Sequence, residues 1–549
     1  MKTGWLGMVL ALAISLPGLV GSVSRSDTTA HMEVLSVASS QFTWMRLQEG
    51  EADAWLVPSW NERPRIHKPP LVVWANLAAW TGLSRETATP DVLLYRARWV
   101  GFVMVILTLC ATAWAGNLLG GRALSFLAPL IFGTMFITLK QTSVATYDTH
   151  LMAWTTLCMA AALQALMGRG SRGVGWWCLA GVFLGLALLT KGPVALLFTI
   201  APLLLMVWLP SVRLPVGRRL LGLLFLVLVA FLVAAPWYSY IAMTVRDLKA
   251  NLATEYLARR EENQPFWYYL GLLGLVFPWT LALIPSLGKR PRGTGWMAAV
   301  WALTVFVLMS IPGAKQQRYI VPILPAMALW IGAFLLASDG KTSRLARGLF
   351  AVHAWLLTLA APMIAGFVLG QPVWISKGWI DAWEIVGLSP WVILGGTLVA
   401  LMAAVMIHRA GRAARYSSGA VWTALWMSIL GGMLQHGYER SHHGHYRYRA
   451  VTEEIHAITT GATIAYLKPA EAWWTEHEPD EKFFFYMQRV IPPLDPAALA
   501  GLESRPDYLL ARDDLEEVRG VAASLGYQPV LSFHDGRRPR VLLKQGSRR

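Results

Sequence analysis

Apolar stretches long enough to cross a membrane recur along this chain and constrain its fold more than any other feature. The 549 residues are 55% hydrophobic and only 15% charged, with 27 tryptophans and a mean hydropathy of +0.45. An ordinary soluble globule does not have such a composition. The sequence therefore predicts an all-α polytopic membrane protein.

About 13 segments meet the length and polarity that a membrane-spanning helix requires. Every second short loop between them is basic and nearly free of acidic residues. The positive-inside rule places these basic loops in the cytoplasm. The opposite loops then face outward, and an odd number of spans also exports the C-terminal segment. The predicted spans lie near residues 4–22, 96–116, 123–139, 149–167, 174–190, 193–210, 219–240, 266–286, 295–312, 319–337, 346–370, 389–408 and 419–435.

The formal net charge of +16 comes from bases scattered over these short loops, not from one aromatic-rich patch. Membrane topology explains this distribution better than a nucleic-acid partner does. The chain has no Walker loop and no GxGxxG motif after a strand, so nucleotide-driven transport has no support. Residues 1–22 also resemble a cleavable secretory signal, because small residues follow at Val20-Gly21-Ser22, and this alternative to a first span stays open.

The character of the chain changes near residue 438. We expect a membrane domain over residues 1–437, with a first outer loop at 23–95 that carries interfacial helices, and a small outer α/β domain over 438–549. The histidines that lead into this domain could bind a metal, but a solvated juxtamembrane linker explains them better. Strands are predicted at 462–467, 508–511 and 540–543, and a helix from Leu515 to Leu525.

Two acidic residues follow the first span. Asp27 would lie near the headgroup layer, where partial desolvation raises the pKa of a carboxylate toward that of a working general base. Asp27 is therefore the candidate base for deprotonating an acceptor hydroxyl. Glu33 is a second catalytic candidate, on a predicted surface helix over about residues 29–47 with Phe42 and Trp44 toward lipid; the alternative is a solvated helix face.

Asp148 stands at the mouth of a later span, where an acid is costly unless it has a partner or a task. A catalytic role is favoured over a cap for the helix that follows. Lys191, in Lys191-Gly192-Pro193, interrupts two apolar stretches at the outer face. It could bind a phosphate or only extend to the interface.

The outward loops also carry more cations than positive-inside statistics predict for that face. Cations from separate loops would suit a phosphate leaving group, because negative charge builds on its oxygens as the bond breaks. Anchoring to anionic lipid headgroups is the alternative for each residue alone. The candidates are Arg259 and Arg260 in the loop at 243–265, and Lys315 and Arg318 beside Tyr319.

Short motifs occur in a defined order over roughly residues 5–340. They are Asp27 and Glu33 in the first loop, Asp53-Ala54-Trp55-Leu56-Val57-Pro58, Lys68-Pro69-Pro70, Thr190-Lys191-Gly192-Pro193, Pro236-Trp237-Tyr238, Pro265 to Tyr269, Phe277 to Trp279 and Lys315 to Pro322. No single motif is decisive, but their order resembles that of the GT-C membrane glycosyltransferases. The resemblance is greatest to the group that contains the lipid A aminoarabinose transferase and the protein O-mannosyltransferases.

This resemblance implies a sugar donor linked to a polyprenyl phosphate such as undecaprenyl phosphate, with no nucleotide. A hexosyl- or pentosyltransferase would move the sugar to a lipid or glycolipid such as lipid A, on the periplasmic side of a bacterial inner membrane. Asp27 would be the general base and Asp148 the second conserved acid, while Lys68, Arg259 or Arg260, and Lys315 would hold the donor phosphate. Transfer would invert the anomeric carbon, because the acceptor oxygen attacks opposite the departing phosphate.

Three positions depart from the family pattern. Thr28 replaces a Glu found in many relatives, His67 replaces the Glu before Lys-Pro-Pro, and Glu255 precedes Tyr256 where a His is expected. In the lipid A transferases the Glu and the His resemble zinc ligands. Here His67 and Glu255 could supply two ligands to zinc or magnesium, fewer than the three or four protein ligands that zinc usually has.

Three functions therefore stay open. A glycosyltransferase is favoured, with a lipid acceptor ahead of a protein acceptor. A transporter or flippase for lipid-linked sugars would predict paired repeats and broken helices at mid-membrane, whereas the acids here gather at one face. A scaffold whose outer domain binds a partner would tolerate replacement of Asp27.

Overall fold

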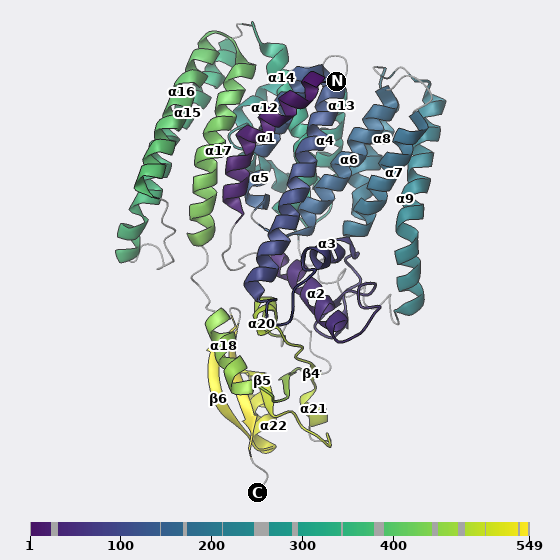
Figure 1. Cartoon of the computed structure of the whole chain (residues 1–549), viewed down its shortest axis with the longest axis vertical. Coiled ribbons are helices and arrows are strands. Elements are labelled where there is room, and N and C mark those ends of the chain that lie inside the picture. Colours follow the sequence, from purple (N-terminus) through teal and green to yellow (C-terminus); the bar gives the residue numbers. More distant parts are fainter. Residues whose placement is uncertain are drawn as a thin grey trace.

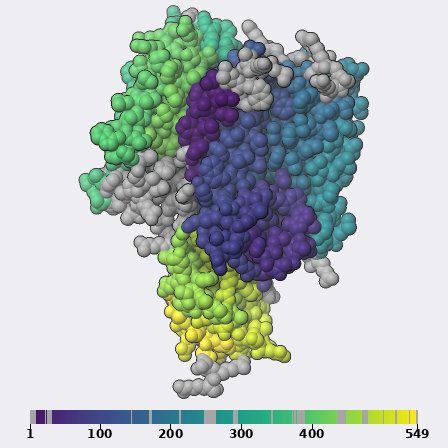
Figure 2. All heavy atoms as spheres, in the orientation of Figure 1, coloured from purple at the N-terminus to yellow at the C-terminus, as the bar shows by residue number. Residues whose placement is uncertain are grey.

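Long helices run side by side in a bundle, and a small domain with a β-sheet projects from one end (Figures 1 and 2). We call this end of the bundle the domain end, and the opposite end, where the first helix begins, the N-terminal end (Figure 1). The computed structural model describes residues 2–23, 31–142, 144–167, 173–210, 212, 214–245, 263–287, 295–341, 344–377, 389–441, 448–469, 478–499, 501–535 and 538–546.

The bundle confirms the prediction of a helical polytopic membrane protein. Its long helices are α1 (Lys2–Ser22), α4 (Pro90–Gly133), α6 (Tyr147–Met167), α7 (Gly173–Lys191), α8 (Ala195–Met206), α9 (Val216–Thr244), α13 (Gly295–Ser310), α14 (Leu324–Ser338), α15 (Arg344–Ser376), α16 (Pro390–Arg412) and α17 (Tyr416–Ser441). Shorter helices join them: α5 (Phe136–Thr142), α11 (Leu272–Leu275), α12 (Thr280–Leu287), η1 (Gly192–Val194), η2 (Phe266–Gly271) and η3 (Gln317–Ile323).

Within the described residues, seven helical stretches are long and apolar enough to cross a membrane by themselves. Two of these, Pro90–Gly133 and Gly173–Met206, each take in most of two predicted spans. Other predicted spans coincide with shorter helices such as Gly295–Ser310. Helices and predicted spans thus occupy the same parts of the chain, and the total of 13 spans stays a prediction.

The chain reverses direction inside α4. Gly120 and Gly121 leave the helical conformation, and Gly121 has a φ of 68°, which glycine adopts without the steric cost of a Cβ atom. The two arms then approach so closely that a Cβ atom on Gly116 would lie 2.7 Å from the carbonyl oxygen of Leu124. Glycine is therefore required both for the turn and for the contact between the arms.

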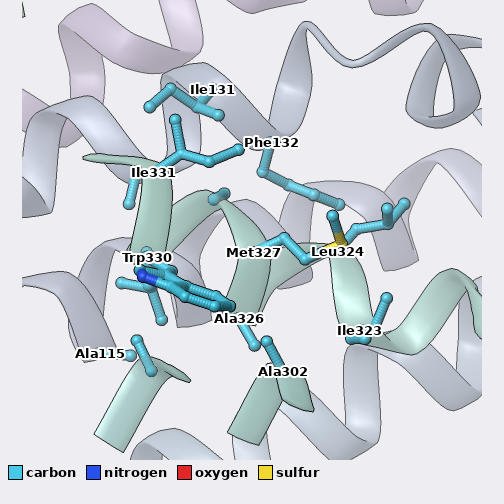
Figure 3. Packing of buried hydrophobic residues seen from close by; sticks show 14 of the residues in the cluster. Ala115, Ile131, Phe132, Ala302, Ile323, Leu324, Ala326, Met327, Trp330 and Ile331 are labelled. Carbon is cyan, nitrogen blue, oxygen red and sulfur yellow. The ribbon is translucent and has the colours of Figure 1, made fainter. Parts of the chain in front are cut away.

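The main hydrophobic core runs through most helices of the bundle, and one part of it lies between α4, α13 and α14. Figure 3 shows side chains from these helices meeting, with Phe132 of α4 and Trp330 of α14 among them. Phe132 is fully buried and Trp330 is 6% exposed. Small residues such as Ala302 and Ala326 let the helices pack closely, as is usual inside membranes.

The first loop is folded and largely covered by protein. It contains α2 (His31–Gln48), α3 (Leu71–Ala79) and a hairpin of β1 (Ser59–Trp60) and β2 (Arg63–Pro64). The prediction that α2 turns Phe42 and Trp44 toward lipid is wrong, since they are 1% and 8% exposed. Phe42 packs edge-on against Trp60, which in turn contacts Phe484 of the C-terminal domain. The sequence pattern identified the helix and its apolar face, but that face is covered by protein and not by lipid.

The C-terminal domain is built on a mixed five-stranded sheet of order β4-β3-β5-β7-β6. β3 pairs in parallel with β4 and β5, whereas β7 is antiparallel to β5 and β6. The predicted strands and helix are confirmed as β3 (Ile464–Leu467), β5 (Tyr508–Arg512), β7 (Pro539–Gln545) and α22 (Glu516–Ser524). The prediction missed β4 (Pro493–Leu494), β6 (Tyr527–His534), α18 (Tyr448–Thr459), α20 (Glu481–Met487) and α21 (Pro496–Leu499).

Hydrogen bonds connect the C-terminal domain to the first loop. The side chain of Asn61 donates to the carbonyl of Ile491 at 2.6 Å and accepts from its N–H at 2.9 Å. Gln41 donates to the carbonyl of Phe485, and Gln488 donates back to that of Ala88. Because these partners are some 400 residues apart in sequence, the C-terminal domain helps fix the shape of the first loop.

Candidate functional site

Asp148 is the centre of a charged cluster at the domain end of the bundle. It lies in the first turn of α6 and is 2% exposed. Lys191, the last residue of α7, places its Nζ 2.5 Å from Asp148 Oδ1. Arg318, at the start of η3, places its Nε 3.7 Å from Oδ2. The carboxylate is therefore shared by cations from two separate elements.

Local sequence explains how Lys191 reaches this position. Gly192 follows it with a φ of 74°, and Pro193 cannot continue the hydrogen-bond ladder of α7. The helix therefore ends at Lys191, at the same end of the bundle where α6 begins. A carboxylate in the first turn of a helix is also favoured by the helix dipole. The contacts of Asp148 with Lys191 and Arg318 are more than a helix cap requires, and its catalytic role stays a prediction.

Tyr319 forms an aromatic wall of this cluster. Its ring centre is 4.7 Å from Lys191 Nζ and 5.3 Å from the guanidinium carbon of Arg318. Cations at such distances are attracted by the ring face. A small cavity opens beside these groups, and it is lined by Met32, Lys68, Thr146, Tyr147, Asp148, Lys191, Arg318 and Tyr319.

The lining of this cavity has unused hydrogen-bonding capacity. The hydroxyl of Thr146 and the Nε of Arg318 are buried and have no hydrogen-bond partner among the described residues. Buried polar atoms nearly always have one, so the two groups suit a ligand with acceptor oxygens. Two cations, Lys191 and Arg318, face one anion, Asp148, so these three groups carry a formal charge of about +1, and Lys68 also lines the cavity. This lining suits an anionic ligand, and we call the cavity the anion site.

Five of the predicted residues thus meet at one cavity: Lys68, Asp148, Lys191, Arg318 and Tyr319. Lys315 does not line it. Its Nζ donates to the backbone carbonyl of Gln264 at 2.9 Å, and the residue is 4% exposed. Lys315 instead ties the segment before η3 to the segment before η2.

Glu33 has structural partners at both carboxylate oxygens. Arg98 of α4 binds them through Nε at 2.8 Å and Nη2 at 2.9 Å, and the N–H of Ala145 donates at 2.8 Å. Glu33 is fully buried and Arg98 is 1% exposed. This geometry favours a role in joining α2, α4 and the approach to α6. The catalytic role of Glu33 stays a prediction.

Several predicted residues fall outside the described part of the chain: Asp27, Glu255, Arg259 and Arg260. His67 is described, and its Nε2 accepts from Arg65 Nε at 3.4 Å. Within the described ranges, no three His, Cys, Asp or Glu residues are close enough to share a metal ion. Binding of zinc or magnesium by His67 and Glu255 stays a prediction.

Sequence reasoning did not assign a role to Thr146, Tyr147 or Arg98. The first two flank Asp148, so their place beside the anion site could have been found from that acid. Arg98 lies inside a predicted span, and a charged residue there usually has a partner or a function. That position was a signal for a buried ion pair, although its partner could not be named.

Comparison with solved structures identifies the class of fold. ArnT from Cupriavidus metallidurans in the apo state has a TM-score of 0.69 and 20% sequence identity, covering 98% of each chain. The same protein bound to undecaprenyl phosphate gives a TM-score of 0.66 and 18% identity over 100% of this chain and 99% of that one. The chain has the fold of the GT-C membrane glycosyltransferases.

Sequence comparison shows which GT-C enzymes this chain resembles. A family model described as dolichyl-phosphate-mannose-protein mannosyltransferase matches residues 76–250. The undecaprenyl phosphate-alpha-4-amino-4-deoxy-L-arabinose arabinosyl transferase 2 of Proteus mirabilis is 26% identical over 293 residues, 50% of this chain and 52% of that protein. The corresponding transferase of Edwardsiella ictaluri is 27% identical over 395 residues, 67% of each. The match thus spans about half to two thirds of these relatives. The predicted resemblance to GT-C enzymes of the aminoarabinose transferase type is confirmed.

Proposed function

We propose that this chain is a glycosyltransferase that moves a sugar from a polyprenyl-phosphate donor to a lipid or glycolipid acceptor such as lipid A. One observation carries the proposal. Lys68, Lys191 and Arg318 converge with Asp148 and Tyr319 on one cavity at the domain end, where the lining has surplus positive charge and unused donors. The names of the relatives supply the donor class, undecaprenyl phosphate.

The charge of the lining suits the chemistry of this leaving group. A polyprenyl-phosphate sugar is a phosphodiester with one negative charge, and the released polyprenyl phosphate is a monoester with up to two. A cavity in which Lys191 and Arg318 face the single acid Asp148 therefore binds the leaving group more strongly as the bond breaks. Interactions that strengthen toward the transition state are those that accelerate a reaction.

The acceptor side of the reaction is assigned to Asp27. In the proposed step Asp27 takes the proton of the acceptor hydroxyl, and the oxygen attacks the anomeric carbon opposite the phosphate. The bond from that carbon to the phosphate oxygen breaks, and its electron pair stays on the phosphate beside Lys191 and Arg318. The product has inverted configuration.

We place the reaction at the periplasmic face of a bacterial inner membrane. The anion site and the C-terminal domain lie at the same end of the bundle (Figure 1), and the basic loop residues Lys341, Arg412 and Arg415 lie at the other. The positive-inside rule assigns the basic end to the cytoplasm.

A protein acceptor is the second candidate. The match of residues 76–250 to the protein mannosyltransferase model favours it. A glycolipid acceptor and a protein acceptor give labelled products of different kinds. The acceptor must therefore be identified from the product.

A label-transfer assay tests the proposal. Purified protein in nanodiscs would receive radiolabelled polyprenyl-phosphate sugars with a total membrane-lipid extract or with periplasmic protein. We expect wild type to label a lipid product, and Asp27→Asn to lose most of that transfer. Exposed Lys544 in the C-terminal domain offers a control, and Lys544→Met should transfer as wild type does. Labelled protein would support the second candidate. Movement of intact donor across the bilayer without any product would show that the protein is a flippase and not a glycosyltransferase of either kind.

A further inference from the structure

The chain just before α6 carries Asp148 into the anion site, and it has no regular structure of its own. Ala145 and Thr146 lie outside any helix or strand, yet each is only 4% exposed. Buried backbone N–H groups need a partner, so the position of such a segment depends on what its N–H groups bond to. Because Thr146 and Asp148 both line the cavity, whatever holds this segment also holds the site.

A buried ion pair holds the segment. Glu33 Oε1 accepts the N–H of Ala145 at 2.8 Å, three residues before Asp148. Arg98 of α4 binds the same carboxylate through Nε at 2.8 Å and Nη2 at 2.9 Å. Two bonds from a planar guanidinium fix a carboxylate in orientation as well as in position. Met32, the neighbour of Glu33 on α2, also lines the cavity, so the pair is tied to two of its walls.

The helix α4 also packs directly against this segment. Gly101 lies one turn after Arg98 on α4. A Cβ atom on Gly101 would lie 3.6 Å from the carbonyl oxygen of Val144 and 3.7 Å from Oγ1 of Thr149. Since these are ordinary contact distances, the start of α6 rests on α4 with room for little more than a methyl group. One turn of α4 therefore supports the start of α6 both by packing and through the ion pair.

We propose that Arg98 and Glu33 are positioning residues of the anion site, which set the place of Asp148 without touching the substrate. Neither of them lines the cavity. Asp148 in turn contacts Lys191 and Arg318 through its two carboxylate oxygens. The inference rests on the proposed glycosyl transfer. A misplacement of about 1 Å can slow a reaction about 10²-fold, whereas the long prenyl chain still supplies much of the affinity for the donor.

Two double variants separate positioning from stability. Both replace Arg98 by Met, so neither has the ion pair. Glu33→Gln keeps an oxygen that can accept the N–H of Ala145, whereas Glu33→Leu has no acceptor. In single-turnover transfer of labelled sugar, we expect the Gln variant to stay within about threefold of wild type and the Leu variant to be about 30-fold slower. The Leu variant should nevertheless be the more stable of the two, because apolar residues often replace a buried ion pair without loss.

The rates of these double variants distinguish three roles for the pair. Wild-type rates in both would show a purely structural pair and overturn the proposal. Loss of transfer in both folded variants would make Glu33 a catalytic residue and also overturn it. Binding of undecaprenyl phosphate gives a second readout, and the Leu variant should bind it about tenfold more weakly than the Gln variant. If wild type transfers no sugar, the proposed function fails, whereas equal binding by the two variants would overturn this inference alone.

Gly101 offers a test that leaves the ion pair intact, in case a double variant does not fold. Gly101→Leu places a larger side chain against the start of α6 and should slow transfer about tenfold. Val103→Leu is the matched control on the same helix, because Val103 is 50% exposed, and it should transfer as wild type does. Transfer at the wild-type rate by a folded Gly101→Leu variant would overturn the proposal.

Discussion

Asp148 and Glu33 show how a buried acid can be stabilised in two ways in the same membrane protein. Glu33 is enclosed by Arg98 and a backbone N–H, so its charge is matched inside the protein. Asp148 contacts two cations, Lys191 and Arg318, so positive charge exceeds negative charge at the cavity beside it. The first arrangement is complete without a ligand, whereas the second gains from an anionic one.

The Glu33–Arg98 pair leads to a stability prediction. Removing one partner of a buried ion pair typically costs about 3–5 kcal/mol, because the other charge is left unpaired in a low-dielectric environment. We expect Glu33→Gln and Arg98→Met each to lower the melting temperature in detergent markedly. The double variant Glu33→Leu with Arg98→Met should recover part of the loss. If both single variants melt as wild type but transfer no sugar, Glu33 acts in catalysis and not in structure.

Glu478 leads to a prediction about pH. Burial raises the pKa of Glu478 to about 7, Arg63 opposes this shift, and Glu481 adds to it. Because the pKa in the folded state is above the unfolded value of 4.5, folding favours the protonated form. The stabilisation is complete below about pH 4.5 and is lost as the pH rises through about 7, by roughly 3 kcal/mol in all.

Thermal unfolding of the full chain at pH 5.5 and pH 8 checks this sign. Because of Glu478, wild type should be more stable at pH 5.5 than at pH 8. At pH 8 the Glu478→Gln variant should be more stable than wild type. The variant should also lose most of the difference between the two pH values. Exposed Glu503→Gln in the same domain is a control that should keep it. A Glu478→Gln variant that keeps the wild-type pH dependence would contradict the assignment.

At the scale of elements, the hairpin of the first loop is held by the C-terminal domain. Asn61 has a φ of 52°, a conformation that Asn tolerates better than most residues, and its amide pairs with both backbone groups of Ile491. The side chain therefore sets both the turn and the contact between the domain and the loop.

We expect Asn61→Gly to weaken that contact selectively. Glycine keeps the positive φ, so the lost free energy, about 1–3 kcal/mol, comes mainly from the unsatisfied groups of Ile491. Hydrogen exchange should become faster in β4 and α20 and stay unchanged in α14. Thr81→Gly, at an exposed position after α3, serves as the control. Faster exchange throughout the bundle, or none, would contradict a local effect.

Elements were predicted most reliably where one physical signal dominated. Runs of about 20 apolar residues located the helices of the bundle, and alternation located β3, β5 and β7. β6 was missed because its residues are mostly exposed or half-buried, so its sequence lacks the clear apolar–polar alternation that identified the other strands. The surface position of α2 was wrong because its cover, α20, lies more than 400 residues away in sequence.

At the scale of the whole molecule, the candidate site brings together five of the predicted residues from four parts of the chain. Lys68, Asp148, Lys191 and the adjacent Arg318 and Tyr319 are brought to one cavity only by the packing of α6, α7 and η3 at the domain end. The sequence could predict that these residues share a face of the membrane. It could not predict that Lys315 is tied to Gln264, because a hydrogen bond to a backbone carbonyl leaves no mark in composition or spacing.

In the proposed reaction, Lys191 and Arg318 stabilise a phosphate leaving group beside Asp148. Single-turnover transfer of labelled sugar, with wild type, Lys191→Met, Arg318→Met and the Lys544→Met control, tests it most directly. Since each cation would act mainly on charge formed in the transition state, we expect both site variants to be slower by about 10²-fold, with the control unchanged. Transfer at the wild-type rate by both site variants would show that Lys191 and Arg318 do not bind the leaving group and that the reaction takes place elsewhere in the molecule.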